Sequence, residues 1–399
     1  MFTAPAPDGS QFPNHSSTDE AVLEALGGYL NEDHVYREGR VVNSICSEPH
    51  PVGVEAFRRA ISSNLGDNRV FPGSTRVERM TVRQIGHLLG NPQACGNLVS
   101  GGTEANILAL LAAIGDREPR DELEVVAPES VHYSVDKAAA VLGIRLVKSR
   151  VDTRYRADVD DLAQCITERT VAIVATAGTS ELGAVDDIPA IADVATQHAL
   201  YFHVDAATGG FLIPFARALG YDLPAFDFAL AGVDSITVDP HKYGLAPIPA
   251  GCIVFRSEGH RSRVRFASHY IGTRTHTTIG GTRSGAAAAA VYAVLNRLGF
   301  EGFVEHTRRL FDVRDYLVSL LHQQAHSLLI PPQLSIVAVR CKNPASVLAR
   351  LEAHGWIASL SKRQQALRIV VHHHLQHRHL SRFVSALTEL AAQPEQVLI

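Results

Sequence analysis

Residues 170–206, TVAIVATAGTSELGAVDDIPAIADVATQHALYFHVDA, decide the fold that this sequence predicts. An apolar run of strand length (170–177) is followed by a helical pattern (188–198) and then by a second apolar run (201–206). Strands that alternate with helices in this way form parallel sheets, because a crossover is needed to bring the chain back to the start of the next strand. We therefore expect an α/β fold with this stretch near its centre.

The same alternation extends outward from this stretch, from about residue 122 to residue 256. A second, smaller α/β pattern follows a strong helix former at 286–298. We expect a mostly parallel central sheet and a smaller C-terminal α/β domain, with an N-terminal arm at 1–45, a large domain at 46–284 and a small domain at 285–399. The other expected strands are 122–127, 145–151, 235–238, 252–256, 334–341 and 366–371, and the other expected helices are 135–142, 159–168, 304–322, 345–354 and 380–392.

The composition excludes several classes of protein. The chain has 399 residues, 46% hydrophobic and 20% charged, with a net charge of −4, so no basic surface for nucleic acid is expected. No apolar run reaches the roughly 18–20 residues that a membrane span needs. The five cysteines are scattered without CxxC spacing, and the N-terminus lacks a signal-peptide pattern, so we expect a reduced, cytoplasmic protein that does not bind membranes.

Two charged residues stand where predicted strands end. Lys242, in DPHK (239–242), follows the expected strand 235–238, and Asp205 ends the expected strand 201–206. Burying an ammonium group is costly, whereas a lysine that forms a Schiff base loses that charge. The alternatives are a surface lysine in a proline-containing turn and an aspartate that caps the next turn.

Two further stretches come earlier in the chain. SGGTEAN (100–106) runs into the apolar helix 107–114, where glycines and free N–H groups would suit a phosphate, although an ordinary capped helix start is the alternative. His132 follows a strand and could lie on a cofactor ring, or could merely start a helix. The joint order of phosphate cradle, histidine, aspartate and lysine along a βα array favours one ligand site at the strand ends.

These stretches resemble those of group II pyridoxal 5′-phosphate (PLP)-dependent amino-acid decarboxylases, whose architecture is fold-type I PLP-dependent transferase-like. The likeness runs from about residue 43 to residue 373, and it is closest to the archaeal-type tyrosine/aspartate decarboxylases. Sphingosine-phosphate lyases and glutamate decarboxylases are more distant. Further matching stretches are SSNLGD (62–67), GTRSG (281–285) and LRIVV (367–371).

The resemblance implies a role for each matching residue. Lys242 would form the Schiff base, Asp205 would face the pyridine nitrogen, and His132 would stack on the ring. Arg368 would take a substrate carboxylate, for which a bidentate guanidinium is suited. Gly281 and Thr282 would reach the phosphate of the neighbouring subunit in a homodimer with a shared active site. The other cofactor-binding residues implied are Gly102, Thr103, Thr179, Ala207 and His241.

The sequence leaves the roles of three features open. Tyr270, in the polar segment 257–280 that matches the family's mobile loop, is a candidate proton donor to the substrate carbon or a plain loop tyrosine. His50, in SEPHP (47–51), is a candidate for substrate binding or part of a rigid turn. The histidines at 372–374, 377 and 379 favour a strand exit into solvent over a metal site, and no metal is expected.

The resemblance implies α-decarboxylation of an L-amino acid. Aspartate, 3-methylaspartate, a carrier-protein-bound aspartyl group and tyrosine are the expected substrates. A carbon–carbon lyase of the sphingosine-phosphate type is the alternative, and a PLP-binding protein without this activity is a third possibility.

Overall fold

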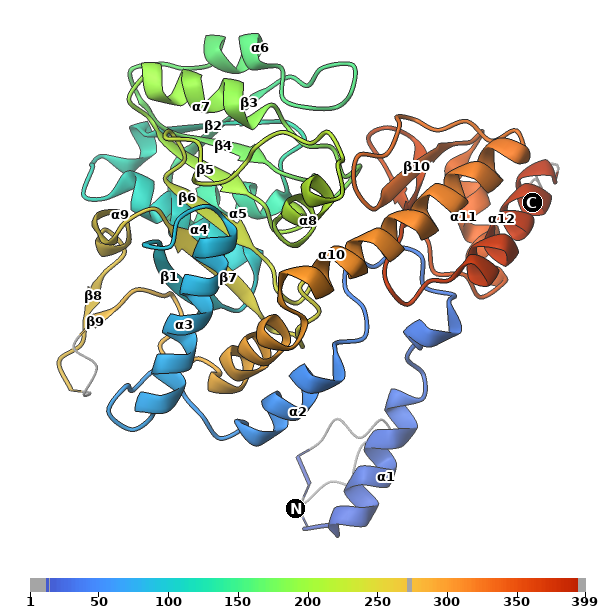
Figure 1. The fold of residues 1–399 in the computed structure, drawn as a ribbon, viewed down its shortest axis with the longest axis horizontal. Helices are drawn as coiled ribbons and strands as arrows, with labels where there is room; N and C mark the ends of the chain where they lie inside the picture. Colours follow the sequence, from blue (N-terminus) through green and yellow to red (C-terminus); the bar gives the residue numbers. More distant parts are fainter. Residues whose placement is uncertain (1–11, 14, 271–274, 394–399) are drawn as a thin grey trace, which may run out of the picture.

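The computed structural model describes residues 12–13, 15–270 and 275–393. Its centre is a seven-stranded sheet with the order β1-β7-β6-β5-β4-β2-β3 (Figure 1). The pairs from β6 to β3 are parallel and β7 is antiparallel to both of its neighbours, so the predicted mostly parallel sheet is confirmed. Its strands are β1 (Cys95–Val99), β2 (Glu124–Pro128), β3 (Arg145–Ser149), β4 (Thr170–Thr176), β5 (Tyr201–Asp205), β6 (Ser235–Val238) and β7 (Gly251–Phe255).

Helices cover both faces of this sheet, because the central strands are apolar on both sides. In β4, Ala172 and Val174 pack in a cluster with α4 (Gly102–Ile114) and α5 (Tyr133–Leu142). The alternate residue Ile173 packs on the other face, in a cluster that includes α7. The remaining helices of this part are α2 (Pro51–Arg59), α3 (Pro72–Leu88), η2 (Arg120–Glu122), α6 (Val159–Gln164), α7 (Ile188–Gln197), η3 (Gly209–Phe211) and α8 (Ile213–Ala218).

Two local differences from the prediction have physical causes. The expected helix 159–168 ends at Gln164, because Thr167 N donates to Thr170 Oγ1 in a turn that leads into β4. Strand β1 has no predicted counterpart, since Gly96 interrupts its apolar run. That glycine lies against β7, where a Cβ would meet the carbonyl oxygen of Ile253 at 1.9 Å.

The C-terminal part contains a three-stranded antiparallel sheet in the order β10-β12-β11. The expected helices 286–298 and 304–322 form one long element, α10, which is interrupted at Gly299, whose φ of +61° favours glycine. Residues of both sheets, such as Phe202 and Val337, share one hydrophobic cluster, and the division at 284 stays a prediction. The elements are α10 (Gly285–Gln323), β10 (Ile336–Arg340), α11 (Pro344–Ala353), β11 (Ser359–Ser361), β12 (Ala366–Val370) and α12 (His377–Ala392).

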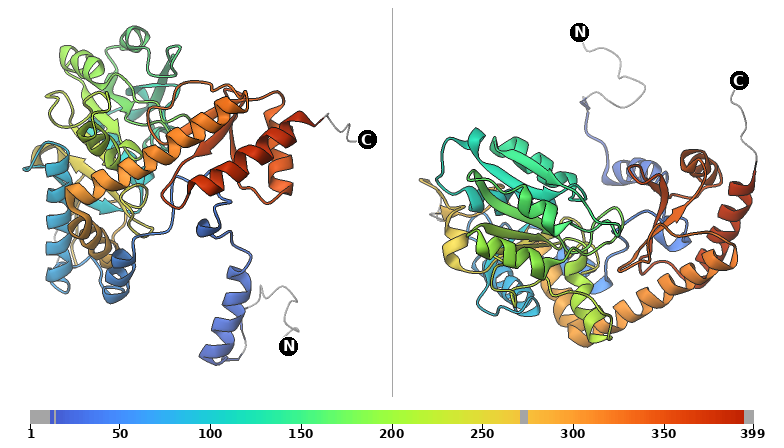
Figure 2. Two further views of the ribbon diagram at one scale, coloured as in Figure 1. Left: turned by 45° about the vertical axis from the view of Figure 1, so that its right-hand side comes forward. Right: turned by 90° about the horizontal axis from the view of Figure 1, so that it is seen from above.

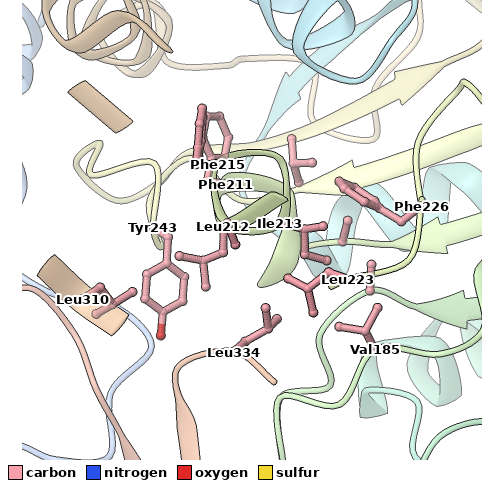
Figure 3. Close-up of a cluster of buried hydrophobic side chains, with 14 of the residues drawn as sticks. Val185, Phe211, Leu212, Ile213, Phe215, Leu223, Phe226, Tyr243, Leu310 and Leu334 are labelled. Atoms are coloured by element: carbon pink, nitrogen blue, oxygen red, sulfur yellow. The ribbon is translucent and has the colours of Figure 1, made fainter. Parts of the chain in front are cut away.

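Packing between these two parts positions the segment that carries Lys242. Figure 3 shows the ring of Tyr243, the next residue, beside Leu310 of α10 and Leu334. The Tyr243 ring also stacks on His372 with the ring centroids 4.5 Å apart. The lysine segment is therefore held from the C-terminal part as well as by its own strand.

The helical start of the N-terminal segment stands apart from both sheets, whereas Val41 and Val42 are buried against the C-terminal part. Helix α1 (Asp19–Leu30) projects away from both sheets and has no buried residue (Figure 2), and η1 (Tyr36–Glu38) follows it. The segment 257–280, expected as a loop, contains α9 (Glu258–Ser262) and the hairpin strands β8 (Phe266–Ala267) and β9 (Thr275–His276). Within the described residues, no helix combines the length and apolar character that crossing a bilayer requires.

Candidate active site

One cavity of about 340 Å³ gathers most of the predicted site residues. It lies where β5 and β6 end and α4 begins, which is the edge of a parallel sheet where ligands bind. The predicted residues that line it are Gly102, Thr103, His132, Asp205, Ala207, His241 and Lys242. The lining residues to which the sequence assigned no role are Ser100, Gly101, Asn106, Ser134, Ser180 and Asp239.

Lys242 brings an amine into this cavity. Its Nζ lies 3.1 Å from Oδ2 of Asp239, and its side chain is 16% exposed. Burial would lower the pKa of Lys242, but the carboxylates of Asp239 and Asp205 outweigh burial and raise that pKa above its usual value. The other oxygen of Asp239, Oδ1, is buried without a hydrogen-bond partner among the described residues. A buried oxygen without a partner indicates room for a further polar group.

The start of α4 offers a place for an anion. No described side chain caps this helix, so its first N–H groups are available to a phosphate. A Cβ at Gly102 would lie 3.0 Å from Asp239 Oδ2 and 3.4 Å from Ala207 Cβ, so the glycine keeps the cradle open. His241 lies beside it, with Nδ1 accepting from Ala250 N (3.1 Å). An amine, a carboxylate and a free helix start together fit PLP, an aldehyde that carries a phosphate and a ring nitrogen.

Asp205 ends β5 and is 4% exposed. Its Oδ1 accepts from Ala207 N (3.0 Å) and its Oδ2 accepts from Asn106 Nδ2 (2.9 Å). Two neutral donors thus orient the carboxylate without neutralising it, as a partner of a protonated ring nitrogen requires. Asn106 is 1% exposed. The sequence signal that could have identified it is a polar amide directly before the apolar run 107–114, because a polar residue on a buried helix needs hydrogen-bond partners.

His132 directly precedes α5, caps this helix and also lines the cavity. Its Nδ1 accepts from Ser134 N (3.3 Å), which caps the helix, and the ring lines the cavity. Burial lowers the pKa of His132, so the ring is neutral at pH 7. A neutral flat ring can stack on an aromatic cofactor.

Arg368 lies next to the cavity in β12. Its Nε donates to the carbonyl oxygen of Ser180 (2.9 Å), and its Nη1 donates to the carbonyl oxygen of Asn43 (3.0 Å) and to Ser359 Oγ (3.1 Å). These contacts hold the guanidinium in place, while among the described residues no partner of Nη2 is found. Thr179, beside Ser180, is buried, and its hydroxyl accepts from Ala184 N (3.1 Å). Thr179 therefore supports the loop that follows β4.

Besides Arg368 and Thr179, four more predicted residues do not line the cavity of this chain. Gly281 and Thr282 are exposed, close to Gly66, where a Cβ would approach the carbonyl oxygen of Gly281 at 2.6 Å. Tyr270 is 92% exposed. His50 caps α2, with Nδ1 accepting from Val52 N (3.2 Å).

The prediction that the C-terminal histidines face solvent is wrong for three of them. His372, His374 and His379 are at most 8% exposed. The ring of His372 is held between Tyr243 and its neighbour His373, whose Nδ1 is 2.7 Å from His372 Nδ1. The strand exit is covered because α10 and the N-terminal segment pack over it.

A larger cavity of about 770 Å³ lies elsewhere, between α3, α10 and the aromatic residues of η3 and α8. Its walls include Phe211, Phe215 and Phe303. Among the described residues that line it, the titratable ones are Arg83 and His87, with neither a lysine nor a carboxylate.

The chain is similar to known proteins along most of its length. The family model of the pyridoxal-dependent decarboxylase conserved domain matches residues 47–342. An L-aspartate decarboxylase of Thermococcus kodakarensis is 41% identical over 383 residues, which cover 95% of this chain and 99% of that protein. A probable L-tyrosine/L-aspartate decarboxylase of Methanothermobacter thermautotrophicus is 39% identical, covering 90% of this chain and 99% of the relative.

The solved structure of a sphingosine-1-phosphate lyase from Burkholderia pseudomallei superimposes with a TM-score of 0.86. It is 26% identical and covers 95% of this chain and 92% of the lyase. The fold expected from the resemblance is therefore confirmed.

Proposed function

The chain belongs to the pyridoxal-dependent decarboxylase family, and on that premise we propose that it removes the α-carboxylate of an aspartate-like L-amino acid. The enzyme is a PLP-dependent carboxy-lyase. The observation that carries the proposal is the convergence of the Lys242 amine, the Asp205 carboxylate and the His132 ring in one cavity at the start of α4.

Each wall of the cavity would hold one part of PLP. The N-terminus of α4, with Thr103 and His241, would bind the phosphate; Asp205 would face the ring nitrogen; and His132 would stack on the ring beside Ala207. When bound, PLP accepts the electron pair that the departing carboxylate leaves behind. The protein contributes orientation and charge, since the side chains are already in place before the reaction.

The replacing proton needs a donor near the reacting carbon. Lys242 is the first candidate for this proton donor. Its amine lies in the cavity 3.1 Å from Asp239 Oδ2, and the nearby carboxylates raise its pKa, so the amine holds a proton. Tyr270 is the second candidate; it is 92% exposed in this chain, and we propose that it acts in the active site of a second subunit.

Arg368 would bind a carboxylate of the substrate through Nη2, since its other nitrogens are engaged. The relatives named for L-aspartate and L-tyrosine support these two substrates first. 3-Methylaspartate and an aspartyl group on a carrier protein belong to the same proposal, because both present the same α-amino acid headgroup.

A homodimer is part of the proposal. Helix α1 exposes apolar side chains, among them Leu23 at 64% and Tyr29 at 67%, and a second copy would cover them. Gly281 and Thr282, exposed here, would complete the partner's phosphate site. All five cysteines are free, which supports the expected cytoplasmic location.

The test is carbon dioxide release from the PLP-loaded protein with aspartate, 3-methylaspartate, glutamate and tyrosine, free and carrier-bound. Release from an aspartate-like substrate is the expected result. A different outcome would be that no amino acid releases carbon dioxide while a phosphorylated amino alcohol is cleaved to an aldehyde. The lyase alternative, which the similarity to the Burkholderia lyase structure supports, would then replace the proposal.

A further inference from the structure

A continuous chain of buried polar side chains runs behind the cavity. It begins at Ser235 in β6, passes through His203 in β5 and Asn106 in α4, and reaches His132 through Ser134. Ser134, His203 and Ser235 are fully buried, and Asn106 is 1% exposed. Since buried polar groups are costly unless each donor meets an acceptor, the direction of every hydrogen bond can be worked out.

Thr237 and His203 determine which way the Asn106 amide points. Oδ1 of Asn106 accepts from Thr237 Oγ1 (2.8 Å) and lies 3.0 Å from His203 Nε2. A carbonyl oxygen only accepts, so His203 carries its proton on Nε2. The amide nitrogen must then face the other way, toward Asp205 and Ser134.

His203 can supply that donor because it has one proton to place. Burial lowers the pKa of His203 to about 4, and the ring is neutral at pH 7. With the proton on Nε2, Nδ1 accepts from the hydroxyl of Ser235 at 2.8 Å, which is the shorter of its two contacts, since the carbonyl oxygen of Ser235 lies 3.2 Å away. Both ring nitrogens are therefore satisfied in one tautomer.

The two N–H groups of Asn106 go to different partners. One donates to Asp205 Oδ2 (2.9 Å) and the other to Ser134 Oγ (2.8 Å). Because Ser134 Oγ accepts from Asn106, its own proton is free for His132 Nδ1 at 2.9 Å. The backbone N–H of Ser134, which can only donate, approaches the same nitrogen (3.3 Å), so two independent contacts make His132 Nδ1 an acceptor.

We infer that Asn106 is a positioning residue that sets two cofactor contacts at once. It holds Asp205 in its acceptor orientation, and through Ser134 it leaves His132 with its proton on Nε2, on the side of the ring away from Ser134. The inference rests on the proposed function, in which Asp205 and His132 face PLP. It assigns a role in the reaction to a residue that does not itself act on the substrate.

The test replaces the amide by a carboxylate of the same shape. Asn106→Asp removes both N–H donors, so the Ser134 hydroxyl is expected to turn toward the new carboxylate and to stop donating to His132 Nδ1. The histidine ring ¹⁵N NMR spectrum of the PLP-free protein should then show the His132 Nδ1 resonance moving toward that of an unbonded ring nitrogen, because only the longer contact from the Ser134 backbone N–H remains. The PLP dissociation constant, measured by titration of the same protein, should rise by about tenfold or more, because a hydrogen bond to Asp205 is lost and a like charge is added.

Asn97→Asp is the matched control. Asn97 is 4% exposed in β1 and accepts from Thr277 Oγ1 (2.7 Å), away from the cavity lining. If Asn106→Asp and Asn97→Asp give the same His132 spectrum and the same PLP affinity, the inference is wrong. Should Asn106→Asp not fold, Ser134→Ala provides the test: the His132 Nδ1 resonance must shift toward that of an unbonded ring nitrogen, and an unchanged resonance overturns the inference.

The experiments distinguish failure of the role of Asn106 from failure of the proposed function. The His132 Nδ1 resonance is read without PLP and without turnover, so it does not depend on the reaction. A wild-type protein that binds no PLP would refute the proposed function, whereas PLP binding with an unaltered His132 Nδ1 resonance in Asn106→Asp would refute only the role of Asn106.

Discussion

The two sides of the cavity are built in different ways. The cofactor side comes from neighbouring strand ends of one sheet and the helix packed on it, with Asp205, Lys242 and Asn106 in buried, hydrogen-bonded positions. The substrate side depends on Arg368, whose partners Asn43 and Ser180 are 325 and 188 residues away in the chain. The first side is a property of one βα array, and the second is assembled only when distant segments pack together.

This difference explains which residues could be recognised from the sequence. A single sheet sets the spacing of the motifs on the proposed cofactor side, so these motifs are recognisable along this chain. The substrate side depends on packing between the N-terminal segment, the loop after β4 and the C-terminal sheet. Small changes in that packing can alter which amino acid binds while the cofactor site stays the same.

The strongest test of the comparison is loss of the amine on the cofactor side. Lys242→Ala should lower turnover by about three orders of magnitude or more and remove the visible absorbance of the lysine-bound cofactor. Turnover is measured as carbon dioxide release, with circular dichroism as the control for folding. Intact activity in this variant would contradict the central assignment.

A second change separates charge from shape at the ring nitrogen. Asp205→Asn keeps the size of the side chain but removes the negative charge, and kcat should fall about 100-fold while substrate KM changes little. Steady-state kinetics on the PLP-saturated variant provide the measurement. A change confined to KM would place Asp205 on the substrate side instead.

On the substrate side the expected effect is smaller and of another kind. Arg368→Lys keeps the charge but cannot make the contacts to Ser180, Asn43 and Ser359 together, so KM should rise about tenfold with a lesser effect on kcat. PLP affinity serves as the control and should stay at the wild-type value. An equal loss of PLP affinity would show that the two sides are not separable.

The smallest effect concerns stability at His373, beside the buried rings of His372 and His374. Desolvation by the surrounding chain, with His374 and His306 nearby, lowers the pKa of His373 to about 4, below the value of about 6.5 in an unfolded chain. The unfolded state therefore takes up the proton first as the pH falls from 6.5 to 4. The free energy of unfolding should decrease in that window by well under about 1.4 kcal/mol per pH unit, because the His373 side chain is exposed and solvent screens its charge.

Urea denaturation at pH 7, 6 and 5 measures this slope. His373→Gln should flatten it, whereas His377→Gln, at a residue whose side chain is 49% exposed, should leave it as in the wild type. Equal slopes in all three proteins would mean that protonation of His373 does not limit stability in acid.

Much of the fold and of the cofactor side could be predicted because both depend on local patterns. The apolar runs 170–177 and 201–206 predict strands β4 and β5 to within a residue, and residues after adjacent parallel strands must lie at one edge. The solvent-facing histidines were predicted wrongly for the opposite reason. Their burial under α10 and the N-terminal segment involves contacts over hundreds of residues, which no local pattern records.

The sequence by itself determined the α/β fold and the PLP family, and it predicts that Lys242, Asp205 and His132 share one site, since their order follows the order of strands. Only the tertiary structure decided the direction of the Asn106 amide, the tautomer of His132 and the partners of Arg368. The physical reason is that a hydrogen bond depends on the position of each donor relative to each acceptor, and these positions are set by packing between elements rather than by spacing along the chain.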